Sequence, residues 1–178
     1  MGRGPYRALL APLVALCATV IVVAGCTAGN GAENRKNGKD DVKQVSQADA
    51  RALVERYAHE VATAVGAAPT PAGGLKTVAN PCEGGSGEVS DAVYSMLGSL
   101  QVTLPETEQL STLAQLRDRW TAQGYTVTED RTFPDGRRGT LTVRNPGDDV
   151  EIALNSTTEA KALAIMITTP CYRSDQPL

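Results

Sequence analysis

Residues 125–169 of this 178-residue chain read YTVTEDRTFPDGRRGTLTVRNPGDDVEIALNSTTEAKALAIMITT. Apolar and polar side chains alternate here in successive short runs, which is typical of strands with one buried face. Two of the connections have turn chemistry, Pro-Asp-Gly at 134–136 and Asn-Pro-Gly-Asp at 145–148. Because consecutive strands with tight turns pair antiparallel, this stretch predicts an antiparallel sheet. The expected strands cover residues 125–133, 141–143, 150–154 and 163–169.

The residues before this stretch predict two helices and one more strand. Apolar residues recur at helical spacing from Ala50 to Val65, after the N-cap residue Ser46 and before Gly66. A second helical pattern runs from Leu110 to Trp120 and is closed by Gly124. Residues 94–104 alternate as a long half-buried strand, whereas residues 67–90 are rich in Pro and Gly and predict a long loop.

The pattern as a whole predicts an α+β fold. We expect an antiparallel sheet of about five strands with two helices packed on one face, in the order α-β-α-β-β-β-β. Aromatic residues are only 4% of the chain. The core is therefore expected to consist mainly of Leu, Val, Ile and Ala.

The N-terminus has the features of a bacterial secretion signal. Arg3 and Arg7 precede an uncharged, largely apolar run of 16 residues, 8–23, which is shorter than the about 20 residues of a membrane span. The run ends in Val23-Ala24-Gly25-Cys26, which resembles the lipobox of bacterial lipoproteins. In that family the cysteine receives a diacylglycerol and the chain is cut just before it. Alternatives are an ordinary secretory signal with a chance cysteine, or an uncleaved anchor.

The lipobox and the composition that follows it predict three segments. Residues 1–25 are expected to be the signal peptide, 26–45 a lipidated flexible tether, and 46–178 a single extracytoplasmic domain. The tether is polar and bears Gly and Asn, so it lacks the apolar surface that folding requires. The expected location is the outer side of the cell membrane, with the membrane contacted through the diacylglyceryl group on Cys26.

The charge of the chain excludes some classes of partner. The formal net charge is −3, and removing residues 1–25 leaves 15 basic and 20 acidic side chains, a net −5. A mildly acidic protein lacks the basic surface that binds nucleic acid. It also lacks a polybasic patch for anionic lipid head groups.

Cys82 and Cys171 are the two other cysteines of the mature chain. Outside the cytoplasm an even number of cysteines predicts a disulfide, here one that clamps both ends of the sheet. A redox pair is the alternative, although the chain has no Cys-x-x-Cys spacing.

Three short motifs resemble small actinobacterial lipoproteins of unknown function. They are Cys82-Glu83-Gly84, the stretch from Trp120 to Val127, and the closing stretch from Thr169 to Tyr172. The motifs are structural rather than chemical. The resemblance implies a monoderm, high-GC source and brings no activity with it.

The sequence contains no recognisable catalytic motif. The sole histidine, His59, points away from the apolar face of its helix, and the chain has no nucleophile elbow, Walker A or dinucleotide fingerprint. Glu129 and Asp130 are expected on opposite faces of a strand, while the turn acids at 148–149 are expected to help close their turn. We therefore predict no catalytic residue, no metal site and no cofactor.

Arg117 is the one charge within the apolar arc of its helix. Its stem is expected to lie along the edge of the core with its head in water. The alternative is a contact surface for a partner or anionic ligand, formed by Arg117 with an exposed Trp120.

These observations predict a non-catalytic docking or binding module of the cell envelope. Its partner would be an envelope protein or a cell-wall component, met through the sheet face away from the helices or an edge strand. The alternative is a carrier that holds a small amphiphile in an apolar cavity between helices and sheet. An unrecognised enzyme is the third and least favoured hypothesis.

Overall fold

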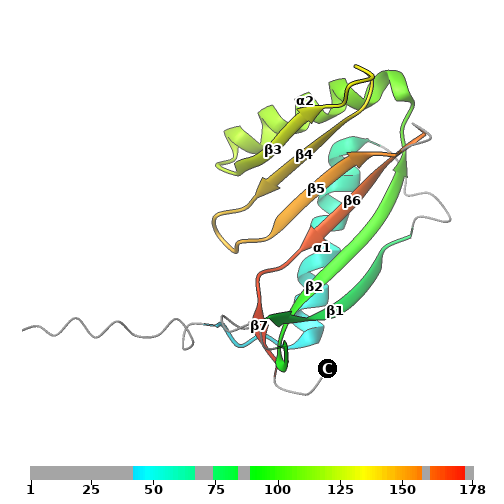
Figure 1. Ribbon diagram of the computed structural model, residues 1–178. Coiled ribbons are helices and arrows are strands. Elements are labelled where there is room, and N and C mark those ends of the chain that lie inside the picture. The colour runs from blue at the N-terminus through cyan, green and yellow to red at the C-terminus, as the bar shows by residue number, and fades with distance from the viewer. Residues whose placement is uncertain (1–41, 67–73, 84–88, 158–160, 175–178) are drawn as a thin grey trace, which may run out of the picture. The chain divides into compact units, whose positions relative to one another are not determined.

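The computed structural model describes residues 42–66, 74–83, 89–157 and 161–174 (Figure 1). The predicted signal peptide, the lipobox with Cys26 and most of the tether lie outside these residues. No helix in the described part of the chain has the length and apolarity needed to span a membrane. The elements, in chain order, are α1 (Gln47–Val65), β1 (Lys76–Glu83), β2 (Val89–Thr103), α2 (Glu106–Ala122), β3 (Thr126–Thr132), β4 (Gly139–Arg144), β5 (Glu151–Ser156), β6 (Ala162–Thr168) and β7 (Tyr172–Arg173).

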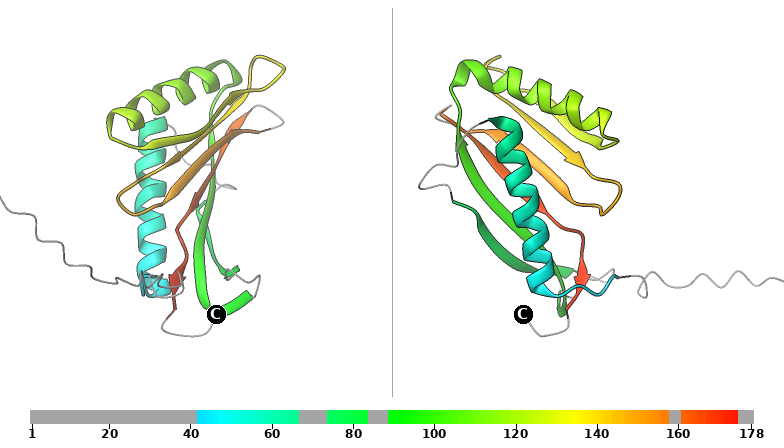
Figure 2. Two further views of the ribbon diagram at one scale, coloured as in Figure 1. Left: turned by 60° about the vertical axis from the view of Figure 1, so that its left-hand side comes forward. Right: turned by 180° about the vertical axis from the view of Figure 1, so that it is seen from behind.

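The predicted α+β class is confirmed. The strands form one sheet in the order β1-β2-β6-β5-β4-β3, with β7 paired to β2, and each pair of neighbouring strands is antiparallel. Both helices lie on one face of this sheet (Figure 2). Helix α1 packs mainly on β2 and β6, and α2 packs on β4 and β3.

The sheet is larger than predicted, because β1 and β7 were missed. The expected loop at 67–90 contains β1, which pairs only with β2 and so forms one edge of the sheet. An edge strand tolerates Pro81 because a proline there need not interrupt a ladder of hydrogen bonds on both sides. The register shifts directly after Pro81. Strand β7 has two residues, too few to show an alternating pattern.

Helix α1 begins and ends as predicted. The Ser46 hydroxyl accepts a hydrogen bond from the Asp49 backbone N–H at 3.1 Å, and Gly66 ends the helix in a left-handed conformation with φ 70°. Gly98 of β2 lies directly beneath the helix, since a Cβ added there would overlap the side chain of Val54. The absence of a side chain at Gly98 therefore sets how closely α1 approaches the sheet.

The core lies between the helices and one sheet face. Alternate residues of the central strands are buried there, and the intervening residues face the opposite side. Helix α2 covers the β3–β4 end, with Leu113, Leu116 and Trp120 buried. The buried sheet residues include Tyr94, Met96, Leu100 and Val102 of β2, Ile152 and Leu154 of β5, and Leu163, Ile165 and Ile167 of β6.

The fold begins before Ser46, which corrects the predicted boundary between tether and domain. The Val45 N–H donates to the Arg173 carbonyl at 3.2 Å, and the Arg173 N–H donates to the Lys43 carbonyl at 2.9 Å. The Tyr94 hydroxyl also donates to the Val45 carbonyl, at 3.0 Å. Residues 43–45 are thus held against β7 and β2.

Candidate functional site

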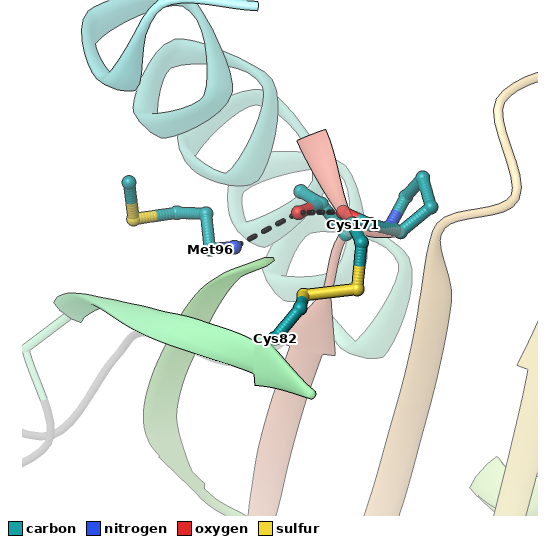
Figure 3. The surroundings of a disulfide bond; sticks show 5 residues. Cys82, Met96 and Cys171 are labelled. Atoms are coloured by element: carbon teal, nitrogen blue, oxygen red, sulfur yellow. Dashed lines mark hydrogen bonds between the residues drawn. A yellow bond between two sulfur atoms is a disulfide. The ribbon is translucent and has the colours of Figure 1, made fainter. Parts of the chain in front are cut away.

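The predicted disulfide between Cys82 and Cys171 is present (Figure 3). Their sulfur atoms are 2.08 Å apart and their Cα atoms 6.2 Å apart. Cys82 lies near the end of β1 and Cys171 lies just before β7. Both strands pair with Tyr94 of β2, so they lie on opposite edges of that strand. The bond therefore links the edge strand β1 to the C-terminal end of the sheet.

The segment before Cys171 is held on β2 by a second, non-covalent contact. The Met96 N–H donates to the Thr169 hydroxyl oxygen at 2.9 Å, and the Thr169 N–H donates to the Met96 carbonyl at 3.0 Å. The Thr169 hydroxyl in turn donates to the Pro170 carbonyl, as the dashed lines in Figure 3 show. Thr169 is 3% exposed, so its hydroxyl is satisfied within the protein.

The turn acids link a sheet turn to helix α1. Asp148 accepts a hydrogen bond from the Tyr57 hydroxyl at 2.8 Å, and the Asn145 side-chain amide donates to the same hydroxyl at 2.6 Å. Burial and the bond to Asp148 raise the pKa of Tyr57 above its usual 10.0. Asp149 closes the turn with a positive φ of 57°. Because Tyr57 and Asp148 are 91 residues apart, no local pattern could have shown this contact.

The sole histidine and the two acids of β3 lie at the surface. His59 is exposed on α1, as predicted. The carboxylate of Glu129 pairs with Arg131 at 3.3 Å, and that of Asp130 pairs with Arg117 at 3.0 Å. Within the described ranges, no group of three His, Cys, Asp or Glu side chains could hold a metal ion.

Trp120 does not form an exposed contact surface with Arg117. Its side chain is 5% exposed and stacks on Tyr125, with ring centroids 6.1 Å apart. Arg117 lies at the surface and pairs with Asp118 at 2.9 Å as well as with Asp130. The exposed tryptophan on which that candidate surface depended is therefore buried in the core.

The sheet face away from the helices, here called the outer face, carries exposed apolar side chains. Val78 is 50% exposed and Met166 is 44% exposed, and these are the exposed large hydrophobic residues of the described chain. Val78 pairs with Leu97, and Leu97 pairs with Thr168, two residues from Met166. Opposite residues of antiparallel strands share a face, so Val78, Leu97 and Met166 form one patch, here called the outer-face patch.

The outer face has an apolar half and a charged half. The outer-face patch covers β1, β2 and β6, which lie in front of α1 in Figure 1. Beside Met166 is a shallow hollow of about 250 Å³, lined also by Lys76 and Gln101. On β4 and β5, Arg144 pairs with Glu151 at 3.1 Å, so the charges of that half compensate each other.

Both edges of the sheet have features that oppose strand addition. The β3 edge carries Glu129, Asp130 and Arg131 and contains a register shift after Val127. The β1 edge contains Pro81 and a further register shift. Charged side chains, prolines and bulges on edge strands hinder pairing with another chain. The outer face is therefore a better candidate for a docking surface than either edge.

Comparison with known proteins identifies no relative of this chain. No family model, curated protein or solved structure matches the chain.

Proposed function

We propose that this protein is a membrane-anchored extracytoplasmic lipoprotein that docks a partner protein through its outer face, without catalysing a reaction. The lipobox at residues 23–26 supports the anchor. The disulfide supports a location outside the cytoplasm, since such bonds persist in oxidising compartments. The observation that carries the docking function is the outer-face patch, in which Val78 and Met166 are both about half exposed.

The patch is large enough to anchor a weak contact. Fully burying a Val or Met side chain contributes about 1.5–3 kcal/mol. Because each of the two is already half buried, covering both contributes about 2 kcal/mol, or about thirtyfold in Kd. A tether to the membrane raises the local concentration of the domain near membrane-bound partners, so a contact of this strength is useful.

A protein partner fits this surface better than a glycan. On the apolar half, the outer-face residues that the register aligns are Lys76, Val78, Leu97, Ser99, Gln101, Ala164, Met166 and Thr168. None of these positions offers an aromatic ring for a sugar to stack on. Aliphatic side chains framed by polar groups match the composition of protein interfaces.

The carrier hypothesis is less well supported. The hollow between α1 and the β1–β2 end of the sheet has a volume of about 420 Å³ and is lined by Ala58, Ala62 and Leu100 among others. It is open to solvent rather than enclosed. A carrier of an amphiphile would be expected to bury most of its ligand.

Complementation of a deletion strain tests the proposal. Replacing Val78 and Met166 together by Glu is expected to abolish complementation while the protein still folds and reaches the membrane. The matched control replaces Thr107 and Ser111, exposed on α2, by Glu and is expected to complement fully. Full complementation by the outer-face variant would contradict docking at this face.

Two further variants test the other parts of the proposal. His59→Ala is expected to complement, and its failure in a folded, membrane-located protein would restore a chemical role. Cys26→Ala is expected to remain uncut and without lipid. Mass spectrometry of the wild-type protein that showed an unmodified chain from Met1 would contradict the anchor.

A further inference from the structure

A second surface hollow lies between the two helices, away from the outer face. The C-terminal end of α2 lies beside the C-terminal half of α1 (Figure 2). The hollow between them, here called the interhelix groove, has a volume of about 360 Å³. It is open to solvent, so it would cover one side of a ligand rather than enclose it. Its lining includes His59, Ala64, Arg119, Trp120, Gln123 and Tyr125.

The aromatic floor of the groove is formed by Tyr125, which is half-buried and stacks on the almost fully buried Trp120. Trp120 and Tyr125 stack with their ring planes 25° apart. Trp120 belongs to the hydrophobic core, so its position is determined by packing. The Tyr125 hydroxyl accepts a long hydrogen bond from Asn145 at 3.4 Å. A preformed aromatic floor favours a ligand with a flat apolar body, because few side chains must be ordered on binding.

The rim of the groove carries Arg119, which forms no ion pair with another described residue. In the described part of the chain six arginines form ion pairs with carboxylates, and Arg119 is not among them. Glu60 also lines the groove, but its carboxylate pairs with Arg56 at 3.4 Å. The position of Arg119 in the last turn of α2 suits the helix dipole, a contribution of a few tenths of a kcal/mol at an exposed site. That contribution leaves the guanidinium able to bind an anion.

We propose that the interhelix groove binds a small amphiphilic anion with a flat, apolar body and one carboxylate group. The body would lie on Tyr125, whose ring stacks on Trp120, and the carboxylate would accept hydrogen bonds from Arg119, with Gln123 as a further donor. Arginine suits this role because its planar guanidinium can donate two parallel hydrogen bonds to a carboxylate. This site is separate from the outer face and does not depend on docking there.

Quenching of tryptophan fluorescence tests the site directly, because Trp120 is the only tryptophan of the chain. The full lipoprotein would be placed in phosphatidylcholine vesicles and titrated with 4-nitrobenzoate, a flat carboxylate whose nitroaromatic ring quenches an indole at short range. The neutral 4-nitrobenzamide is the matched probe. We expect saturable quenching by both probes, with a Kd about fivefold lower for the carboxylate, as one partly exposed ion pair provides.

Variants identify the group that recognises the anion. Arg119→Gln is expected to remove the fivefold preference, and Arg119→Lys to retain part of it. Arg51→Gln is the control, because Arg51 is exposed on α1, forms no ion pair among the described residues and does not line the groove. Non-saturable quenching, or a preference that survives in a folded Arg119→Gln variant, would overturn the proposal. The Val78→Glu/Met166→Glu variant is expected to bind normally, so failure of one proposal does not decide the other.

Discussion

Breaking the Cys82–Cys171 bond is expected to lower the melting temperature sharply. The bond joins residues 89 positions apart. For a loop of this length the chain-entropy model gives a stabilisation of about 4–5 kcal/mol at 25 °C. A folded region of about 130 residues has an unfolding entropy near 0.27 kcal/mol/K, so the expected decrease in Tm is about 15 °C. Residual structure in the unfolded chain would reduce this value, and we take about 7 °C as the lower limit.

The assay is calorimetry of the protein with and without a phosphine reductant, together with titration of free thiols. The Cys82→Ala/Cys171→Ala variant is the control, because the reductant should leave its Tm unchanged. A fully reduced protein that melts within about 7 °C of the oxidised form would refute a stabilisation of this size. Two titratable thiols in the folded protein under oxidising conditions would refute the bond itself.

Three further predictions concern the packing and the turns. Gly98→Ala is expected to destabilise the fold by about 1–3 kcal/mol, because the added methyl group overlaps the side chain of Val54. Denaturant unfolding of the two single variants and of the Gly98→Ala/Val54→Ala double variant will show whether the two sites are coupled. Tyr57→Phe is expected to cost about 1–3 kcal/mol at pH 7, because it leaves Asp148 without this donor. Since folding raises the pKa of Tyr57, its contribution to the free energy of unfolding is complete below pH 10.0 and is lost as the pH rises further. Unfolding measured at pH 7 and above pH 10 should therefore show a smaller loss of stability at high pH in Tyr57→Phe than in the wild-type protein. The Arg137 N–H and the Arg138 side chain lower the pKa of Asp135 from 3.8 to about 2. This carboxylate therefore stabilises the β3–β4 turn above pH 3.8 and loses that effect as the pH falls toward 2. An NMR titration that gave an ordinary pKa for Asp135 would contradict the turn contacts.

Local sequence signals predicted the elements that depend on interactions between residues close in sequence. The N-cap at Ser46, the left-handed Gly66 and the alternation along β2 each depend on neighbours within a few positions, and the structure confirms all three. Strand β1 was missed because Pro and Gly normally indicate a loop. Its edge position, which makes Pro81 acceptable, is a property of the whole sheet and is absent from the local pattern.

The boundary of the fold could not be predicted from side chains. Residues 43–45 are mostly polar, so their composition indicated a tether. They are held instead by main-chain hydrogen bonds to Arg173, which depend little on side-chain type. Such pairing between distant segments becomes visible only when the fold is known.

The candidate surfaces also combine features that the local sequence predicts with contacts that depend on the whole fold. Helical periodicity correctly placed Arg117 near the apolar arc, but its ion pair with Asp130 depends on where β3 lies. The outer-face patch could not have been found, because Val78 lies in the missed strand and its pairing with Leu97 requires the register. The sequence suggested the sheet face away from the helices or an edge strand as a contact surface, and the residues on that face became known only with the strand register.

Photo-crosslinking in intact membranes tests the central claim most directly. A benzophenone amino acid would replace Met166 on the outer face, or Ser111 on α2 as the control, in the full lipoprotein at its normal level. The account predicts one discrete crosslinked protein from position 166, none from position 111, and loss of that product when Val78→Glu is added. Equal crosslinking from both positions, or a product from position 111 alone, would contradict docking at the outer face.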